Sequence, residues 1–206
     1  MKKINLLFFI FCFLISLNAQ DIQLLPPDTT GGMPLMEALS KRETNRNFSQ
    51  KEISNQQLSN LLWAAFGINR PNGKRTAPSA RNSQEIDVYV FMKTGTYLYL
   101  PAENSLKQVY NQDIRDQLPK QEGFKDTPLL ILLVANYDKM ERFDDAAKEF
   151  YGAIDAGYIS QNIYLFCTSE NLTTCAIGMI QRDQIKELLK LNGKPIIAHS
   201  IGVKED

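Results

Sequence analysis

The segment Arg42-Glu43-Thr44-Asn45-Arg46 has the residue types of an anion-binding site. Arg42 and Arg46 flank the hydroxyl group of Thr44. Two guanidinium groups and one hydroxyl donor suit the several acceptor oxygens of a phosphate monoester. Spacing alone favours a solvated charged loop, so the phosphate site is a hypothesis that needs support from the rest of the chain.

A second candidate lies in the polar loop 68–85, where the stretch 75–82 combines rigidity with small side chains. Pro78 restricts the backbone, and the small residues Ser79 and Ala80 would let a flat ligand approach the main chain closely. Asn82 offers both a donor and an acceptor. Taken alone, this is also the composition of an ordinary polar loop.

A third candidate is the stretch 153–162, which has helical periodicity and is strongly apolar around three notable residues. Gly157 inside a helix costs about 1 kcal/mol relative to alanine, which predicts close packing at that position. Asp155 and Asn162 need partners if they are buried. The pattern fits either a helix–helix contact or the wall of a cofactor site.

The fourth candidate is the stretch 172–178, a predicted tight turn into a short packed segment that contains Cys175 and Gly178. Spacing does not separate a binding role from a packing role. Cys167 and Cys175 would form a disulfide or remain two semi-buried thiols. The single histidine, His199, excludes a multi-histidine metal centre, and any Ser-His or Cys-His dyad would have to use it. No metal site is predicted.

These segments must be positioned by mixed elements without a regular βαβ repeat, which indicates the α+β class. A short helix starts at Pro34, and Ser54 opens a helix to Phe66 with a capping box, ended by Gly67. Asn171 is expected to end the long helix in a left-handed conformation. Further helices are expected at 105–118, 143–169 and 182–191, and strands at 86–92, 97–100, 129–135 and 196–203.

The N-terminus predicts export. Residues 1–19 have two lysines, an apolar run and a small residue before a polar sequence, which is typical of a signal peptide cleaved after Ala19. The alternative is an uncleaved N-terminus that tethers the chain to the membrane. Residues 20–33 are expected to form an irregular leader arm before a domain at 34–206. The 23 basic and 23 acidic residues argue against a strongly basic nucleic-acid binder.

Taken together, the four segments resemble the FMN-dependent nitroreductase superfamily, most closely its SagB-type azoline dehydrogenases. The family's Arg-Arg-Ser-x-Arg segment appears here as Arg42-Glu43-Thr44-Asn45-Arg46, and its Leu-Leu-Trp-Ala-Ala-x-Gly segment as Leu61 to Gly67. Its Arg-x-x-Pro-Ser-Ala segment is matched by Arg75 to Ala80. Its Gln-Asn pair is matched by Gln161-Asn162, and its later small-residue segment by Cys175 to Gly178.

The resemblance implies a central, mainly antiparallel sheet flanked by helices, and an intertwined homodimer with one FMN at each of two shared interfaces. Within this picture one chain contributes the arginine segment and its partner the proline-serine loop, while Asp155 and Gly157 lie near the isoalloxazine ring. The expected cofactor-binding residues are Arg42, Thr44, Arg46, Pro78, Ser79, Ala80, Asn82, Asp155, Gly157, Cys175, Gly178 and Lys204.

The function that the resemblance implies is an exported FMN-dependent oxidoreductase. It would transfer hydride through flavin N5 by a ping-pong mechanism, with NAD(P)H as a transient electron donor and a small-molecule electron acceptor. No side chain then has to be a nucleophile or a general base. The alternative is a non-enzymatic flavin- or ligand-binding dimer that retains the fold. Glu43 departs from the family pattern and would weaken the anion site.

Overall fold

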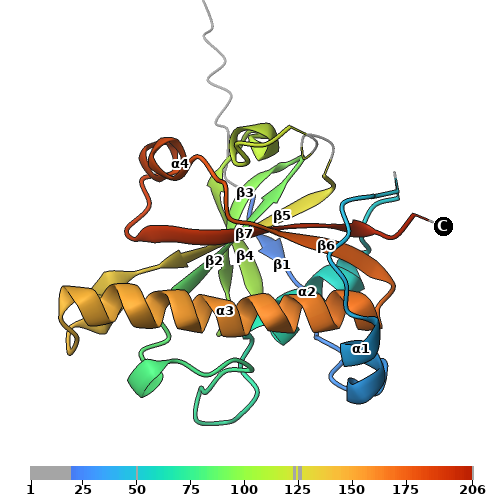
Figure 1. Cartoon of the computed structure of the whole chain (residues 1–206), viewed down its shortest axis with the longest axis horizontal. Coiled ribbons are helices and arrows are strands. Elements are labelled where there is room, and N and C mark those ends of the chain that lie inside the picture. Colours follow the sequence, from blue (N-terminus) through green and yellow to red (C-terminus); the bar gives the residue numbers. More distant parts are fainter. Residues whose placement is uncertain (1–19, 50, 123, 125–126, 206) are drawn as a thin grey trace, which may run out of the picture.

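Seven strands form one antiparallel sheet in the order β1-β4-β3-β2-β5-β7-β6 in the described part of the chain (Figure 1). The computed structural model describes residues 20–49, 51–122, 124 and 127–205, so the predicted signal peptide lies outside the described residues. The strands are β1 (Ile22–Gln23), β2 (Ile86–Met92), β3 (Gly95–Leu100), β4 (Ser105–Tyr110), β5 (Leu129–Ala135), β6 (Leu172–Ile177) and β7 (Lys194–Val203).

The central strand β5 is the apolar run that the sequence predicted as a strand buried on both faces. All seven of its residues are buried, and it pairs with β2 on one side and β7 on the other. A strand covered on both faces must be apolar throughout, whereas a strand with one solvated face alternates. The composition of this run therefore places it in the middle of the sheet.

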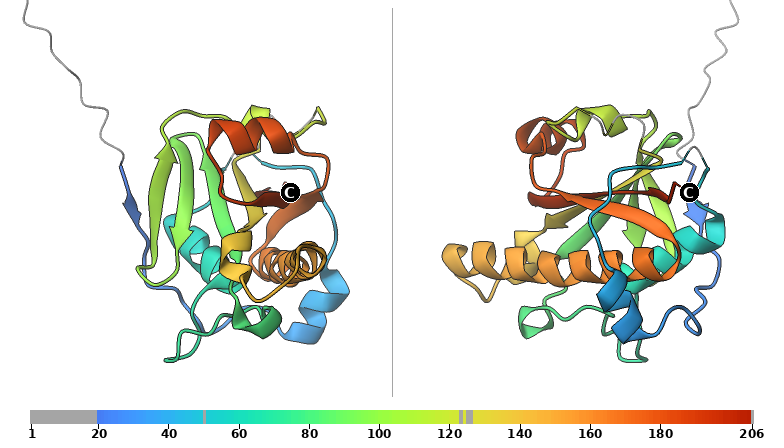
Figure 2. Two further views of the ribbon diagram at one scale, coloured as in Figure 1. Left: turned by 90° about the vertical axis from the view of Figure 1, so that its left-hand side faces the viewer. Right: turned by 45° about the vertical axis from the view of Figure 1, so that its right-hand side comes forward.

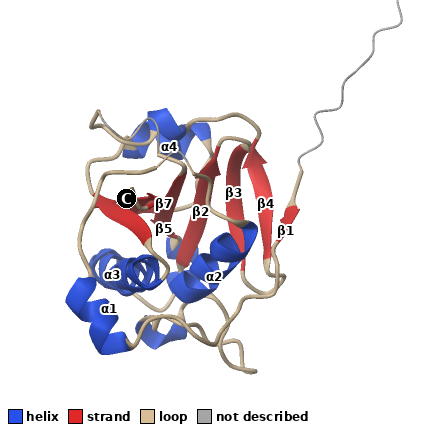
Figure 3. Ribbon diagram, turned by 90° about the vertical axis from the view of Figure 1, so that its right-hand side faces the viewer, coloured by secondary structure: helices blue, strands red, loops and turns tan. Residues whose placement is uncertain are grey.

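Helices cover the two faces of the sheet unequally (Figures 1 and 3). The helices α1 (Leu35–Lys41), α2 (Asn55–Phe66) and α3 (Asp145–Ser169) lie on one face, and α4 (Arg182–Leu188) lies on the other. Leu61 and Leu62 of α2 and Ile159 of α3 belong to the core on the first face. Ile185 of α4 belongs to the core on the second face. The fold is therefore α+β, as predicted.

The capping box predicted at Ser54 is present. The Ser54 side chain accepts a hydrogen bond from the backbone N–H of Gln57, and the Gln57 side chain accepts one from the backbone N–H of Ser54. Gly67 ends the helix as expected, but for a different reason. Its backbone is extended, and a Cβ there would lie 2.5 Å from Trp63 Cδ1. Glycine is needed at this position because Trp63 occupies the space.

Helix α3 also follows its prediction closely. Asp144 caps it by accepting a hydrogen bond from the Ala147 N–H, and the turn beyond the helix contains Asn171 at a φ of 55°. Asparagine tolerates this left-handed conformation better than most residues. Asn162 donates a hydrogen bond to the Ala64 carbonyl oxygen at 3.1 Å, which ties α3 to α2.

The prediction of a helix at 105–118 is wrong. This segment forms β4, which pairs with β3 and with β1, followed by a short 3₁₀ turn at Arg115–Gln117. Leu106 is fully buried, and the residues after it alternate between exposed and half-buried, which is the two-residue repeat of a strand. Strand pairing therefore decided the structure of this segment over its weak helical pattern. The leader arm is also not wholly irregular, because Ile22 and Gln23 form β1 at the outer edge of the sheet (Figure 2).

Three further differences concern the C-terminal elements. The stretch 172–178 contains a full strand, β6, which pairs with β7 at the end of the sheet. Helix α4 ends at Leu188 rather than Leu191, and β7 starts at Lys194 rather than Ile196. None of the helices in the described residues is long and apolar enough to span a membrane.

Candidate functional site

The arginine segment leaves α1 and runs alongside β6. Arg42 is the C-terminal cap of α1, and the Asn45 N–H donates a hydrogen bond to the Thr174 carbonyl oxygen at 3.1 Å. Thr44 Oγ1 lies 3.0 Å from the hydroxyl oxygen of Tyr164 on α3. The Arg42 guanidinium carbon lies 5.3 Å from the centre of the Tyr164 ring. One tyrosine thus supports both the cation and the hydroxyl group of the predicted phosphate segment.

The Tyr164 hydroxyl group holds two segments at once. Its oxygen accepts a hydrogen bond from the Ala176 N–H at 3.0 Å and shares a second hydrogen bond with Thr44 Oγ1, in which either hydroxyl group can be the donor. When Tyr164 donates, Thr44 keeps its own hydrogen for an external acceptor. Consecutive hydrogen bonds of this kind polarise one another, so this arrangement can present Thr44 to an anion.

His199 supports Tyr164 from the sheet. Its ring is fully buried and lies edge-on to the Tyr164 ring, with 5.1 Å between the ring centres. Its Nε2 lies 2.7 Å from Ser160 Oγ, and its Nδ1 lies 3.1 Å from Thr174 Oγ1. Burial lowers the pKa of His199 to about 3, so the ring is neutral. The Ser160–His199 contact resembles a dyad but is sealed inside the core, where no substrate reaches it.

The ion pairs around this segment do not involve Arg42 or Arg46, so both can contact an anionic ligand. Lys204, the predicted additional phosphate ligand, lies with its Nζ 2.9 Å from Glu43 Oε1 in an exposed ion pair. Lys204 and Glu43 therefore satisfy each other. Neither Arg42 nor Arg46 forms an ion pair with another described residue. Two guanidinium groups without an ion-pair partner among the described residues, beside the Thr44 hydroxyl group, suit the oxygens of a phosphate monoester.

Both cysteines of the described chain are buried free thiols. Burial raises the pKa of Cys175, while the charge of Arg46 opposes this rise, which puts Arg46 close to Cys175 at the end of β6. Burial also raises the pKa of Cys167. Gly178 follows β6 directly, is exposed, and has no described atom within 4 Å of the position that a Cβ would occupy. The end of β6 beyond Cys175 is therefore open.

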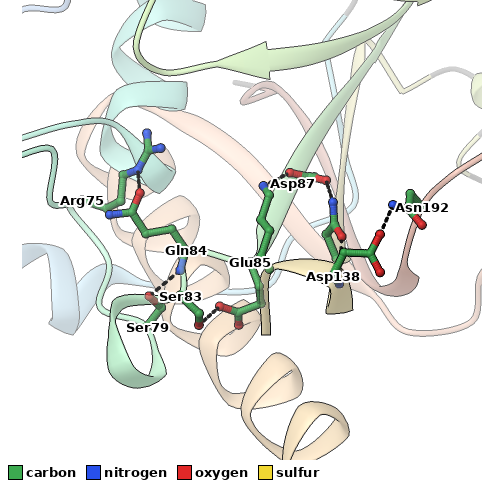
Figure 4. Close-up of polar contacts among 10 residues, drawn as sticks. Arg75, Ser79, Ser83, Gln84, Glu85, Asp87, Asp138 and Asn192 are labelled. Atoms are coloured by element: carbon green, nitrogen blue, oxygen red, sulfur yellow. Dashed lines mark hydrogen bonds and ion pairs between the residues drawn. The ribbon is translucent and has the colours of Figure 1, made fainter. Parts of the chain in front are cut away.

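The proline-serine loop forms a second cluster, supported by a different part of α3. The Ala80 N–H donates a hydrogen bond to Asp155 Oδ2 at 2.8 Å. Ser79 Oγ accepts one from the Gln84 N–H at 2.9 Å, and Gln84 Oε1 accepts one from Arg75 Nε at 2.9 Å (Figure 4). Asp155 is therefore the buried anchor of this loop. Arg75 points back towards the loop's base rather than outward with Ser79 and Ala80.

The two clusters do not meet within one chain. Asp155 and Tyr164 are nine residues apart on α3, which corresponds to about 13 Å along the helix axis and about half a turn around it. Thr44 and Arg46 therefore lie near the part of α3 that contains Tyr164. Residues 78–82 lie near the part that contains Asp155. The site residues that the sequence analysis grouped together form two separate halves in a single chain.

The surface of α1 and α3 carries an unusual number of exposed apolar side chains. Met36 on α1 is 76% exposed, and Phe150 and Tyr158 on α3 are 61% and 47% exposed. Gly157 lies beside Tyr158, and a Cβ on Gly157 would meet no described atom within 4 Å. The close packing predicted for Gly157 is therefore not made within one chain. An exposed apolar face of this kind is typical of an interface.

Three supporting residues were not predicted as site residues from the sequence. Two are Tyr164 and His199, and the third is Glu85, a buried residue at the end of the proline-serine loop whose Oε2 lies 2.7 Å from Ser83 Oγ. Tyr164 lies within the apolar helical stretch and resembles a core aromatic residue. His199 lies on a buried strand, and Glu85 closes a polar loop. No spacing rule links Tyr164 to Thr44 or Glu85 to Asp155, so only the contacts identify them.

Comparison with known proteins agrees with this geometry. The model of the Nitroreductase family matches residues 39–203. A protein of Methanocaldococcus jannaschii named as a nitroreductase is 27% identical over 197 residues, which cover 91% of this chain and 98% of that protein.

Two solved structures extend the comparison. A crystal structure named as a nitroreductase from Ralstonia eutropha superimposes with a TM-score of 0.82 and 37% identity over 90% of each chain. An NADPH:FMN oxidoreductase from Vibrio harveyi shares the fold, with a TM-score of 0.64 and 17% identity over 84% of this chain and 69% of its own.

Proposed function

Because this chain belongs to the nitroreductase family, we propose that it is an FMN-dependent oxidoreductase and that the arginine segment binds the FMN phosphate. The observation that carries the proposal is that Tyr164, itself held by the Ala176 N–H, hydrogen-bonds Thr44 Oγ1 and so fixes this hydroxyl group within the arginine segment. Arg42 and Arg46 flank that hydroxyl group without ion-pair partners among the described residues. This donor set fits a phosphate dianion.

The second part of the proposal is that a complete site needs two copies of the chain. The two clusters lie at different positions along α3, and an apolar face that includes Met36, Phe150 and Tyr158 remains exposed. A homodimer that buries this face would cover the central helices. It would also bring Pro78 to Asn82 of one copy towards the arginine segment of the other. The open space at Gly157 supports a close approach of helices there.

FMN, when bound, supplies a hydride acceptor and donor at its N5. The residues of this chain then have binding and shaping roles. Arg42, Thr44 and Arg46 hold the phosphate, Ser79 and Ala80 present their backbone to the flat ring system, and the open end of β6 at Gly178 leaves room beside it. The buried, neutral His199 stabilises Tyr164 and takes no part in proton transfer to substrate.

The physiological assignment belongs to the same proposal. We infer a nitroreductase-type enzyme of the SagB-like branch with ping-pong turnover, in which a donor such as NAD(P)H reduces the flavin and a small-molecule acceptor reoxidises it.

Export on residues 1–19 is also part of the proposal. Mass spectrometry of the protein recovered from the cell envelope or medium should show an N-terminus at Gln20, and recovery of the chain starting at Met1 would contradict cleavage.

The decisive experiment measures flavin binding and reduction on the purified mature chain. We expect a yellow protein with about one FMN per chain and tighter binding of FMN than of riboflavin, which lacks the phosphate. Bleaching of the flavin absorption by NADH, NADPH or a periplasmic donor would support an enzyme. A dimer that binds FMN but resists every donor would instead be a non-enzymatic flavin-binding protein. A colourless protein that does not bind added FMN would overturn the proposal.

The variant Arg46→Ala identifies the phosphate site. Removing one charge-assisted hydrogen bond, worth about 1.5–3 kcal/mol, should weaken FMN binding by about 10- to 100-fold and leave riboflavin binding unchanged. The control is Lys186→Ala, which removes an exposed cation on α4, on the opposite face of the sheet. Equal FMN affinity in Arg46→Ala and the unaltered protein would remove Arg46 from the site.

A further inference from the structure

Two buried carboxyl groups lie beneath the proline-serine loop. Glu85 is 0% exposed and Asp155 is 2% exposed, and both are tied to Ala80, Asp155 through the Ala80 N–H and Glu85 through Ser83 Oγ, which also bonds the Ala80 carbonyl oxygen. The Asp155 carboxyl group is close enough to Glu85 to raise its pKa. Asp155 Oδ2 accepts the Ala80 N–H. Glu85 Oε2 lies 2.7 Å from Ser83 Oγ (Figure 4). Glu85 Oε1 is buried and accepts no hydrogen bond from a described residue.

Two neighbouring carboxyl groups in a buried site favour one proton between them. If both were ionised they would repel each other, whereas one proton allows a hydrogen bond between them. No described basic side chain forms an ion pair with Glu85. Two residues further along the chain, Asp87 is neutralised by Lys139 and also accepts a hydrogen bond from Asn136 at 3.1 Å (Figure 4).

We propose that Glu85 is a positioning residue: in its protonated form it donates a hydrogen bond to Asp155 and thereby holds Asp155 on the Ala80 N–H, which sets the shape of the loop Pro78–Asn82. The step that connects this loop to FMN rests on the function proposed above. The step that connects Glu85 to the loop rests only on the contacts within this chain.

The loop needs such an anchor because its backbone is strained. Arg81, Asn82 and Gln84 have φ values of 51°, 57° and 48°, in the left-handed region that residues other than glycine enter rarely. Strained conformations of this kind persist only where the surroundings impose them. The Ala80–Asp155 hydrogen bond ties this segment to α3, and hydrogen bonds within the loop, such as those from the Gln84 N–H to Ser79 Oγ and from the Asn82 N–H to the Ser79 carbonyl oxygen, hold its own turn. Loss of the first would release the strained segment from α3.

The groups around Glu85 favour the protonated form. Burial is the main cause that raises the pKa of Glu85 to about 7, the Asp155 carboxyl group raises it further, and the hydrogen bond from Ser83 opposes the rise. Tyr137 faces the same space with a buried hydroxyl group that has no partner in the described residues. Lys194 and Glu149, which both act on Tyr137, pair with each other. The proton on Glu85 is therefore lost to solvent as the pH rises above neutrality.

The first test uses the flavin-free protein, so it does not depend on the proposed function. Hydrogen exchange of the segment 79–84 is measured between pH 6 and pH 9 and expressed as protection factors, which removes the intrinsic effect of pH on exchange. In the unaltered protein we expect protection to fall at least tenfold above pH 7. In Glu85→Gln, whose neutral amide still donates to Asp155, protection should stay constant. The control Glu187→Gln changes an exposed glutamate on α4 and should behave like the unaltered protein.

A second variant keeps the test decisive if Glu85→Gln folds poorly. Asp155→Asn retains an oxygen for the Ala80 N–H and adds a donor towards Glu85, so Glu85 can ionise without repulsion and protection should again be independent of pH. Protection in the unaltered protein that does not change between pH 6 and pH 9 would overturn the proposal. So would a decline of the same size in Glu85→Gln.

The second test measures FMN affinity over the same range. The dissociation constant of the unaltered protein should rise by about tenfold per pH unit above pH 7, because only the protonated form holds the loop, and it should stay constant in Glu85→Gln. Riboflavin should show the same profile, which separates the loop from titration of the phosphate. A pH-dependent loop in a protein that binds no flavin would contradict the proposed function alone. FMN binding with a flat profile, together with a pH-dependent loop, would contradict the link between the loop and FMN alone.

Discussion

The hydroxyl oxygen of Tyr164 lies 3.0 Å from Thr44 Oγ1, and this contact joins α3 to a segment 120 residues earlier in the chain. The same hydroxyl group accepts the Ala176 N–H. A single side chain therefore fixes the arginine segment and the end of β6 relative to each other. Both segments were expected to contact the same cofactor, and Tyr164 is the physical link between them.

Tyr164→Phe tests this link, because it removes the hydroxyl group and keeps the ring that packs against His199 and Arg42. The Ala176 N–H then lacks its acceptor, and Thr44 lacks its hydroxyl partner. Because neither hydrogen bond is fully buried, each is worth about 0.5–1.5 kcal/mol, so we expect FMN to bind about two- to tenfold more weakly in fluorescence titrations, with a native far-ultraviolet circular dichroism spectrum.

The matched control is Tyr110→Phe on β4, a strand of the opposite half of the sheet from β6. It should bind FMN like the unaltered protein. Unchanged FMN affinity in Tyr164→Phe would mean that Tyr164 does not prepare Thr44 for a ligand, and the phosphate site would then have to lie elsewhere.

The exposed apolar face of α1 and α3 predicts a dimer that a single charge disrupts. Tyr158→Glu introduces a carboxylate on the central helix, where burial of an unpaired charge is costly. Analytical ultracentrifugation should show a dimer for the unaltered protein and a monomer for Tyr158→Glu, and the monomer should lose bound FMN. Val109→Glu, at an exposed position of β4, is the control and should remain dimeric. A dimeric Tyr158→Glu would place the interface on another surface.

His199 predicts a specific response to acid. Its folded-state pKa of about 3 lies below the value of 6.5 expected in the unfolded chain, so the unfolded chain binds more protons between these two values. Stability should therefore fall as the pH falls from about 6.5 to 3, with a slope of up to about 1.4 kcal/mol per pH unit from this group. Urea unfolding at a series of pH values measures this slope.

His199→Gln supplies the comparison. It should be less stable than the unaltered protein at pH 7, because Ser160 and Thr174 lose a well-placed partner, but its stability should depend less on pH between 6.5 and 3. Parallel curves for the two proteins would show that His199 does not titrate on unfolding in this range. The raised pKa of Glu85 acts in the opposite direction between about 4.5 and 7, so the comparison is cleanest below pH 4.5.

Much of the fold could be predicted because its signals are local. The Ser54 capping box involves residues three apart, the seven apolar residues of β5 are consecutive, and Asn171 needs only its own side chain to accept a positive φ. The prediction for segment 105–118 failed because its spacing was ambiguous and its partners decided the outcome. Pairing with β1 and β3 supplied hydrogen bonds and buried Leu106, which an isolated helix would not do.

The candidate site, too, could be predicted only in part. The residue types of Arg42, Thr44 and Arg46 and of Pro78 to Ala80 were readable along the chain, because phosphate binding and close backbone approach demand those types. The residues that hold these site residues in place could not be predicted from the sequence. Tyr164 serves Thr44, and Asp155 with Glu85 serves Ala80, across separations that no periodicity spans. Folding alone decided that the two halves diverge along α3, because a helix turns about 100° per residue and sends Asp155 and Tyr164 to opposite sides.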